Sequence, residues 1–222
     1  MKNTSTPRVK ICCIGSVEEA ALAVELGASA IGLVSQMPSG PGVISDELIA
    51  EIAATVPPPI ATFLLTSKQD VQAIIDQQRL CRTNCIQICD RIATGTHREL
   101  KRALPGIALI QVIHVTGRES VEEAVAVARD VDAILLDSGN QSLPVKELGG
   151  TGRRHDWALS REIRERIPVP MFLAGGLNAA NAQAAVREVG SFGLDVCSGV
   201  RTDGKLDRAK LQAFFAAVRS AS

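Results

Sequence analysis

The chain has 222 residues, of which 46% are hydrophobic and 22% charged, and its 24 basic and 24 acidic side chains balance. This length allows one large core, and the balanced charge excludes a general attraction to nucleic acid or to an anionic membrane. No apolar run is long enough to span a membrane, and residues 1–8 lack the apolar core of a signal peptide. We therefore expect a short polar lead-in over residues 1–8 and a single domain over residues 9–222.

Six cysteines occur without a CxxC pair, mostly inside apolar runs, which favours free thiols in a reducing cytoplasm over a disulfide framework. Cys81, Cys85 and Cys89 are spaced by four residues, as metal ligands on one helix face would be. However, residues 85–88 have the pattern of a strand, and no nearby histidine completes a ligand set. We therefore expect no metal site.

Short apolar segments alternate with amphipathic segments along the whole chain. The predicted strands cover residues 9–14, 30–34, 60–65, 85–88, 109–115, 133–137, 169–174 and 194–197. The predicted helices cover residues 17–26, a segment after Ser45, residues 70–80, 96–103, 119–128, 157–166 and 178–189, and a segment from Asp207 to about residue 218. Eight strand–helix units without a linker favour a single (β/α)8 TIM barrel with a parallel eight-stranded core. An open doubly wound sheet is the alternative, but its glycine fingerprint usually follows the first strand, where this chain has none.

Glycines cluster after the sixth, seventh and eighth predicted strands. In TIM barrels, phosphate groups tend to bind the loops after strands seven and eight, at a helix N-terminus. Because glycine lets backbone N–H groups approach an anion closely, these loops predict a phosphate site; the alternative is that the glycines only form tight turns. The expected phosphate-binding residues are Gly150, Gly152, Gly175, Gly176, Ser198 and Gly199.

Asp137 ends the apolar run of residues 133–136, at the tip of the sixth predicted strand. A carboxylate there is a candidate acid or base, although capping the next loop is the alternative role. Cys12, on the first strand, would face Asp137 across a closed barrel, and a carboxylic acid opposite a thiolate suits an acid–base isomerisation. Lys10 should point to the same side as Cys12 and favour its thiolate form. Strand alternation suggests that Cys13 turns toward the helices, but the sequence leaves open whether it faces the site or the helices. The alternative for Cys12 is a small buried hydrophobic residue.

Several segments occur in an order that is typical of one enzyme family. They are Val9-Lys10-Ile11-Cys12, Leu26-Gly27-Ala28 through Gly32-Leu33-Val34, Leu135-Leu136-Asp137, Gly149-Gly150-Thr151-Gly152 with Asp156-Trp157, Leu173-Ala174-Gly175-Gly176-Leu177-Asn178, and Asp195-Val196-Cys197-Ser198-Gly199-Val200. With them the chain resembles the phosphoribosylanthranilate isomerases of tryptophan biosynthesis along nearly its whole length. The resemblance implies an Amadori rearrangement of an N-(5-phosphoribosyl) amine without metal or organic cofactor. It implies that Asp137 is the general acid that opens the sugar ring and that Cys12 is the general base that removes the C2′ proton.

The chain departs from the family pattern at several positions. Cys13 stands where the family has glycine, and residues 37–43 lack the arginine that reaches the anthranilate carboxylate in the family. Cys89 and Asp90 replace a histidine–glycine pair, and Arg201 replaces a glutamate. We therefore expect the phosphate side and the acid–base pair to be kept and the side that binds the amine to be rebuilt. The expected substrate-lining residues are Lys10, Gln87, Asp90, His114 and Arg153.

The leading hypothesis is a phosphoribosylanthranilate isomerase-type enzyme whose partner is a small phosphoribosyl substrate. Two alternatives stay open: an enzyme acting on a different phosphoribosyl compound, and a non-catalytic sugar-phosphate-binding barrel. The sequence indicates no oligomeric state.

Overall fold

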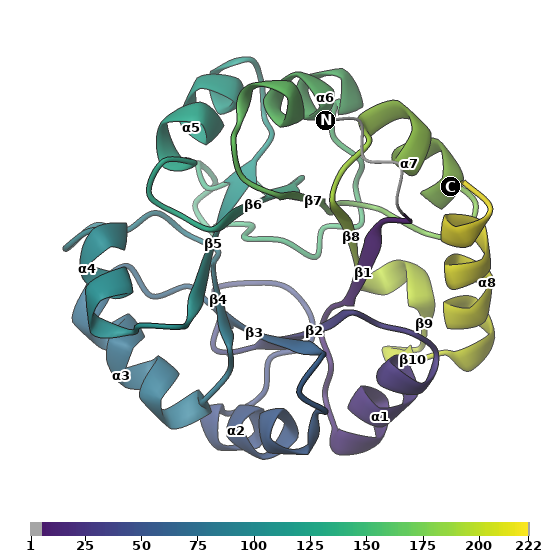
Figure 1. Ribbon diagram of the computed structural model, residues 1–222, viewed down its shortest axis with the longest axis horizontal. Helices are drawn as coiled ribbons and strands as arrows, with labels where there is room; N and C mark the ends of the chain where they lie inside the picture. Colours follow the sequence, from purple (N-terminus) through teal and green to yellow (C-terminus); the bar gives the residue numbers. More distant parts are fainter. Residues whose placement is uncertain (1–5, 222) are drawn as a thin grey trace.

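A computed structural model describes residues 6–221, which form a closed barrel of eight parallel strands in chain order, ringed by eight α-helices (Figure 1). The barrel strands are β1 (Arg8–Ile11), β2 (Ala30–Val34), β3 (Ala61–Thr66), β4 (Cys85–Ile88), β5 (Ala108–His114), β6 (Ala133–Asp137), β7 (Met171–Leu173) and β8 (Gly193–Val196). The helices are α1 (Val17–Glu25), α2 (Asp46–Thr55), α3 (Val71–Cys81), α4 (His97–Ala103), α5 (Glu119–Val127), α6 (Trp157–Arg166), α7 (Ala182–Val189) and α8 (Arg208–Arg219). The predicted TIM barrel is confirmed. Of the predicted lead-in, residues 1–5 lie outside the described part of the chain.

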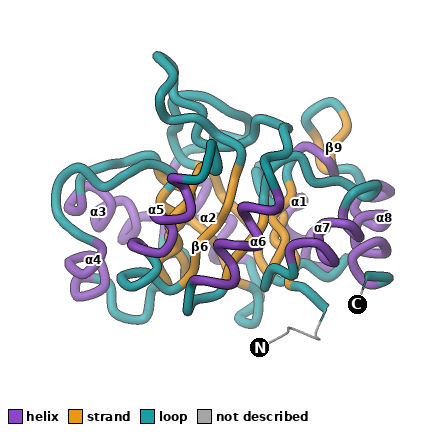
Figure 2. Tube along the Cα trace, turned by 90° about the horizontal axis from the view of Figure 1, so that it is seen from above, coloured by secondary structure: helices purple, strands orange, loops and turns teal. Residues whose placement is uncertain are grey.

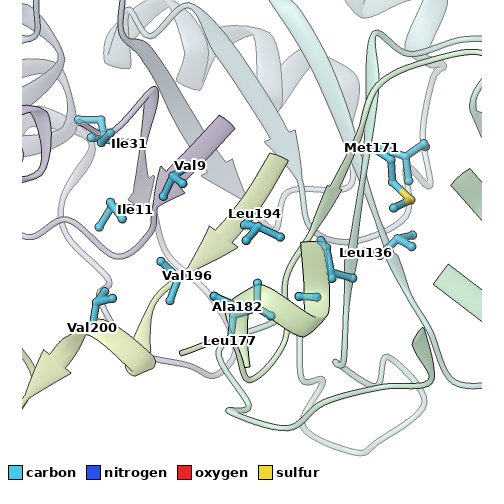
Figure 3. Packing of buried hydrophobic residues seen from close by; sticks show 14 of the residues in the cluster. Val9, Ile11, Ile31, Leu136, Met171, Leu177, Ala182, Leu194, Val196 and Val200 are labelled. Carbon is cyan, nitrogen blue, oxygen red and sulfur yellow. The ribbon is translucent and has the colours of Figure 1, made fainter. Parts of the chain in front are cut away.

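Two apolar layers hold the barrel together, because successive side chains of a strand point to opposite faces. Ile11, Leu136 and Leu194 belong to the outer layer, which packs against helix residues such as Ala182 (Figure 3). A separate inner cluster fills the barrel; it includes Ala30, Phe63, Leu65, Val112, Leu135 and Phe172. Each large apolar side chain buried in this way stabilises the fold by about 1.5–3 kcal/mol. Within residues 6–221, no helix is long and apolar enough to cross a membrane.

Most element ends lie within two residues of the sequence prediction, but one end of β1 and one end of α7 differ by three or four residues. β1 ends at Ile11, not at residue 14, because Cys13 adopts a φ of 60°, in the left-handed region where a strand cannot continue. α7 begins at Ala182, not at residue 178, because a turn precedes it. In that turn the backbone N–H of Asn178 donates a hydrogen bond to Asn181 Oδ1 at 2.9 Å.

A small hairpin between β8 and α8 was not predicted. It consists of β9 (Arg201–Thr202) and β10 (Lys205–Leu206), which pair antiparallel. Asp203 and Gly204 connect them with positive φ angles of 49° and 77°, as a tight two-residue hairpin turn requires. Strands of two residues are too short to show an alternating pattern in the sequence.

Long loops rise from one end of the barrel, the end on which β9 also lies (Figure 2). The longest, residues 138–156 between β6 and α6, is called the β6 loop below. It meets residues 35–45, the β2 loop, where the Ser39 hydroxyl donates a hydrogen bond to the Lys146 carbonyl oxygen at 2.7 Å. These two loops together cover the carboxyl ends of the strands, where TIM-barrel active sites lie.

Candidate active site

A pocket opens at the carboxyl ends of the barrel strands, beneath the β2 and β6 loops. Its wall combines Cys12 from the end of β1, Gln87 from β4 and Asp137 from the end of β6. Of the residues predicted from the sequence, the pocket brings together Cys12, Gln87, Asp137, Gly150, Gly152, Gly175, Gly176 and Ser198. The tertiary structure therefore gathers the two candidate chemical groups and most of the candidate phosphate-binding residues at one site.

The three glycine loops converge on one side of this pocket. Gly176, with a φ of 62°, lies so close to the β6 loop that a Cβ atom there would be 2.8 Å from the Gly152 carbonyl oxygen. A Cβ atom at Gly152 would lie 3.9 Å from Ser198 Oγ, at the start of the short 3₁₀ helix η1 (Ser198–Val200). The backbone N–H groups of Gly152, Gly175, Gly176 and Ser198 donate no hydrogen bond to another residue of the described chain. Unpaired N–H groups in a concave site suit an anion such as phosphate.

Gly199 has a packing role in this arrangement. It follows Ser198 in η1 but is not part of the pocket wall. A Cβ atom at Gly199 would overlap the Leu177 carbonyl oxygen and would come within 3.0 Å of Asn178 Cα. Glycine at this position therefore lets the loop after β8 pack directly on the loop after β7.

Asp137 is a buried carboxyl group at the end of β6 and is only 9% exposed. Burial raises its pKa above the usual range of an aspartate, and the nearby Asp195 carboxylate acts in the same direction. The Ser138 backbone N–H donates to Asp137 Oδ1 at 2.7 Å and partly opposes this shift. The other oxygen, Oδ2, faces Gly149, where a Cβ atom would be 2.7 Å away. A carboxyl group with a raised pKa holds its proton at higher pH and can act as a general acid.

Cys12 lies above a buried ion pair inside the barrel. Lys10 and Asp195 are register partners on β1 and β8, and Lys10 Nζ lies 2.9 Å from Asp195 Oδ2. Burial lowers the pKa of Lys10, but the Asp195 carboxylate and the nearby Cys12 and Cys89 sulfurs together outweigh it and hold that pKa above the usual range of a lysine. The same ammonium group lies 3.7 Å from Cys12 Sγ. The Lys10 ammonium group therefore places a positive charge directly beside the Cys12 sulfur.

Cys13 faces the pocket, which settles the orientation that the sequence left open and differs from the one that strand alternation suggested. Its positive φ turns the chain and breaks that alternation. Cys13 Sγ lies 2.6 Å from Cys197 Sγ, at the end of β8. Hydrogen bonds with the Cys12 and Cys197 thiols raise the pKa of Cys13. The pKa of Cys197 is lowered, because its hydrogen bond with Cys13 and the positive charge of Arg201 outweigh the effect of its burial.

Arg201 holds the turn that carries the two neighbouring cysteines. Its Nη2 atom donates hydrogen bonds to the carbonyl oxygens of Cys12, at 3.2 Å, and Cys13, at 2.5 Å. Its Nη1 atom forms an ion pair with Glu19 in α1 at 2.8 Å. Arg201 is one of the departures from the family pattern, whereas Glu19 carries no local signal in the sequence, because the two residues are 182 positions apart.

Four of the predicted substrate-lining residues do not form part of the pocket wall. Lys10 is fully buried one layer below the wall, in the pair with Asp195. His114 turns aside to Cys89, with its Nε2 atom 3.0 Å from the Cys89 carbonyl oxygen. Asp90 and Arg153 are each engaged by a residue of the β6 loop, so their side chains do not reach the wall.

Two basic residues of the β6 loop, Lys146 and Arg153, already have carboxylate partners. Lys146 Nζ lies 2.6 Å from Asp90 Oδ2, and Arg153 is paired with Glu147. These pairs join the β6 loop to the end of β4 and stabilise the loop itself. Among residues 6–221, no lysine or arginine forms part of the pocket wall, although Asp137 and Asp195 do.

The described chain also contains no cluster of three or more His, Cys, Asp or Glu side chains arranged to hold a metal ion. Cys81 ends α3, whereas Cys85 begins β4 and Cys89 follows it. The three cysteines therefore belong to different elements, as the strand pattern predicted.

Comparison with known proteins gives consistent matches over nearly the whole chain. A family model described as N-(5'phosphoribosyl)anthranilate (PRA) isomerase matches residues 9–217. The N-(5'-phosphoribosyl)anthranilate isomerase of Methanocella arvoryzae is 32% identical over 213 residues, which cover 96% of this chain and 98% of that protein. The enzyme of the same name from Halobacterium salinarum is 33% identical over 214 residues, 94% of each chain.

Solved structures agree with these sequence matches. The phosphoribosyl anthranilate isomerase of Thermotoga maritima superposes with a TM-score of 0.81 at 28% identity, covering 96% of this chain and 99% of that one. A phosphoribosyl anthranilate isomerase in complex with reduced 1-(o-carboxyphenylamino)-1-deoxyribulose 5-phosphate superposes with a TM-score of 0.78 at 27% identity, with the same coverage.

Proposed function

Because the chain belongs to the N-(5'-phosphoribosyl)anthranilate isomerase family, we propose that it converts an N-(5-phosphoribosyl) amine from the aldose to the ketose form with Asp137 as acid and Cys12 as base. The chain is an aldose–ketose isomerase of this type, and the residues that carry out the steps form the proposal. The observation that carries it is that Asp137 and Cys12 share one pocket with the unpaired N–H groups of the glycine loops.

Binding begins at the phosphate group of the substrate. The N–H groups of Gly176 and Ser198, together with those of the β6 loop, hold this phosphate and so fix the sugar in the pocket. Asp137 then gives its proton to the ring oxygen, the bond between C1′ and that oxygen breaks, and a Schiff base forms. The raised pKa of Asp137, which results mainly from burial, keeps this proton available.

The second step is the removal of the C2′ proton. Cys12 acts as a thiolate, supported by the Lys10 ammonium group 3.7 Å away. Loss of the proton converts the Schiff base into an enolamine, which becomes the ketose on tautomerisation. Carbon 1 is reduced and carbon 2 is oxidised within the same molecule, so the reaction balances without an external electron carrier.

Variants at the two groups test this mechanism. In Asp137→Asn and Cys12→Ser enzymes, kcat should fall by about 10²–10⁴-fold, the contribution of a positioned acid or base. Binding of inorganic phosphate should persist, because the glycine loops are unchanged. Cys85→Ser is the matched control, since Cys85 is buried in the barrel but is not part of the pocket wall. Full activity in either active-site variant would refute the assigned roles.

A second candidate is an isomerase of the same type that takes an amine without a carboxylate. It is favoured by two observations: the pocket wall contains no lysine or arginine, and Lys146 and Arg153 of the β6 loop are already paired with carboxylates. Phosphoribosyl-aniline and phosphoribosylanthranilate differ only in the carboxylate, so their kcat/KM values separate the two candidates. If the second candidate holds, the aniline compound is the better substrate, and Met37→Arg improves use of the anthranilate compound. Val43→Arg is the control, because Val43 lies in the same loop outside the pocket.

The proposal includes a small-molecule substrate as the partner and the cytoplasm as the location. All six cysteines are free, and free thiols are typical of a reducing compartment. The balanced charge of the chain gives nucleic acid no general attraction.

A further inference from the structure

We propose that Cys13 and Cys197 form a two-thiol oxidation site, which a hydroperoxide converts reversibly into a disulfide next to the catalytic Cys12. The two thiols come from opposite ends of the chain, 184 residues apart, and their sulfur atoms lie 2.6 Å from each other. Both line the active-site pocket, so a small oxidant that enters the pocket reaches them. The isomerase mechanism uses neither of them.

The backbone places Cys13 for this contact. Its φ of 60° directs the side chain toward β8, and Arg201 holds the turn through the Cys12 and Cys13 carbonyl oxygens. Gly42 of the β2 loop makes room for it, because a Cβ atom at Gly42 would lie only 2.5 Å from Cys13 Cβ. Two thiols held together in this way can form a disulfide with little movement of the main chain.

Cys197 is the thiol that we expect to react first. It is partly exposed, whereas Cys12 and Cys13 are 7% and 6% exposed. The guanidinium group of Arg201 favours its thiolate form, and the thiolate is the species that attacks a peroxide. Its exposure and the nearby charge of Arg201 therefore point to Cys197, and not to Cys13, as the attacking sulfur of the pair.

The reaction takes place in two balanced steps. The Cys197 thiolate attacks the peroxide, a sulfur–oxygen bond forms, the oxygen–oxygen bond breaks, and the leaving oxygen takes a proton to become an alcohol or water. This leaves a sulfenic acid on Cys197. Cys13 sulfur then attacks Cys197 sulfur, the sulfur–oxygen bond breaks, and the released hydroxide leaves as water with the Cys13 proton. The thiol pair loses two electrons, and the hydroperoxide gains two.

This chemistry would protect the proposed general base. A thiol that is oxidised beyond the sulfenic acid is lost irreversibly, whereas a disulfide is restored by a dithiol reductant. If the Cys13–Cys197 pair consumes peroxide in the pocket, Cys12 remains a thiol and the enzyme recovers after reduction. The cross-link does not depend on the proposed function, but the recovery of activity depends on Cys12 being the base.

The test is a titration of the full-length enzyme with hydrogen peroxide, followed by thiol counting and peptide mass mapping. The wild-type chain should lose two free thiols and gain one cross-link between the peptides that contain Cys13 and Cys197, and dithiothreitol should restore both the thiols and the activity. Cys197→Ser should form no such cross-link and should recover about fivefold less of its own starting activity. Cys81→Ser is the control, because Cys81 is buried between helices and should behave as the wild type.

Two results would overturn the inference. One is an oxidised wild-type enzyme in which Cys13 and Cys197 remain thiols, which mapping detects without any variant. The other is equal recovery of activity in the wild type and in Cys197→Ser, which would remove the protective role. A cross-link formed by an enzyme without isomerase activity would instead leave the oxidation site standing and reject the proposed function.

Discussion

Replacement of Lys10 by methionine should destabilise the barrel strongly, because it leaves a carboxylate without its partner in the interior. Lys10 is completely buried and Asp195 is 7% exposed, and the pair is 2.9 Å apart. Breaking a buried ion pair by removing one partner costs about 3–5 kcal/mol of unfolding free energy. For a chain of this length, that loss corresponds to a decrease in Tm of about 6–20 °C.

The pH dependence of this contribution follows from the pKa of Lys10. Burial lowers that pKa, but Asp195 together with the Cys12 and Cys89 sulfurs raises it by more, so the net shift is upward and Lys10 is charged at neutral pH. A group whose pKa is raised on folding adds stability below its unfolded pKa and loses it as the pH rises through the folded pKa. The difference in Tm between the wild type and Lys10→Met should therefore stay constant near neutral pH and shrink only in strongly alkaline solution.

Thermal unfolding followed by circular dichroism measures this effect. Lys101→Met is the matched control: it removes an exposed ion pair with Asp132, which is worth about 1 kcal/mol or less. The double variant Lys10→Met/Asp195→Leu removes both charges and should regain most of the lost stability. If the unfolding free energy of Lys10→Met lies within about 1 kcal/mol of the wild-type value, the pair contributes no more than an exposed ion pair and the reasoning fails.

Three further predictions concern the pocket and its loops. Gly176→Ala should weaken binding of inorganic phosphate in calorimetry and should lower stability by about 1–3 kcal/mol, because its Cβ atom would lie 2.8 Å from a carbonyl oxygen at a positive φ. Gly204→Ala, with a positive φ but open space, should leave phosphate binding intact. Lys146→Met removes the ion pair with Asp90 and should make the β6 loop the first site of limited proteolysis, whereas unchanged cleavage would show that other contacts hold the loop. Because burial raises the pKa of Asp137, the kcat of the wild type should fall as the pH rises through that pKa. The residual kcat of Asp137→Asn should not show this decrease, because asparagine has no proton to lose.

The sequence by itself was sufficient to predict the architecture and to place Asp137 and the glycine loops at the same end of the barrel. Strand and helix periods are local, so eight alternating apolar and amphipathic segments predict eight strand–helix units regardless of what they contact. In a barrel, the carboxyl ends of all strands meet at one face, so Asp137 and the glycine loops were predicted to share a site from their chain positions alone. The structure places Asp137, Gly152, Gly176 and Ser198 in one pocket.

Only the tertiary structure decided which polar groups face the substrate and which bind each other. Lys10, Asp90 and Arg153 were predicted as lining residues, but each forms an ion pair. Lys10 pairs with Asp195 inside the barrel, and Asp90 and Arg153 pair with residues of the β6 loop. Such pairing depends on side chains from distant elements, which no local pattern records. The sequence identifies residues that are able to carry charge, but their final partners depend on the geometry of the packed barrel.

The orientation of Cys13 illustrates the same limit at a single residue. Strand alternation suggested that it faces the helices, but a left-handed backbone conformation turns it into the pocket, within 2.6 Å of Cys197. That conformation is stabilised by Arg201, almost the whole chain away in sequence and adjacent in space. Local periodicity therefore determined the elements of this protein, while long-range contacts between loops determined the composition of its site.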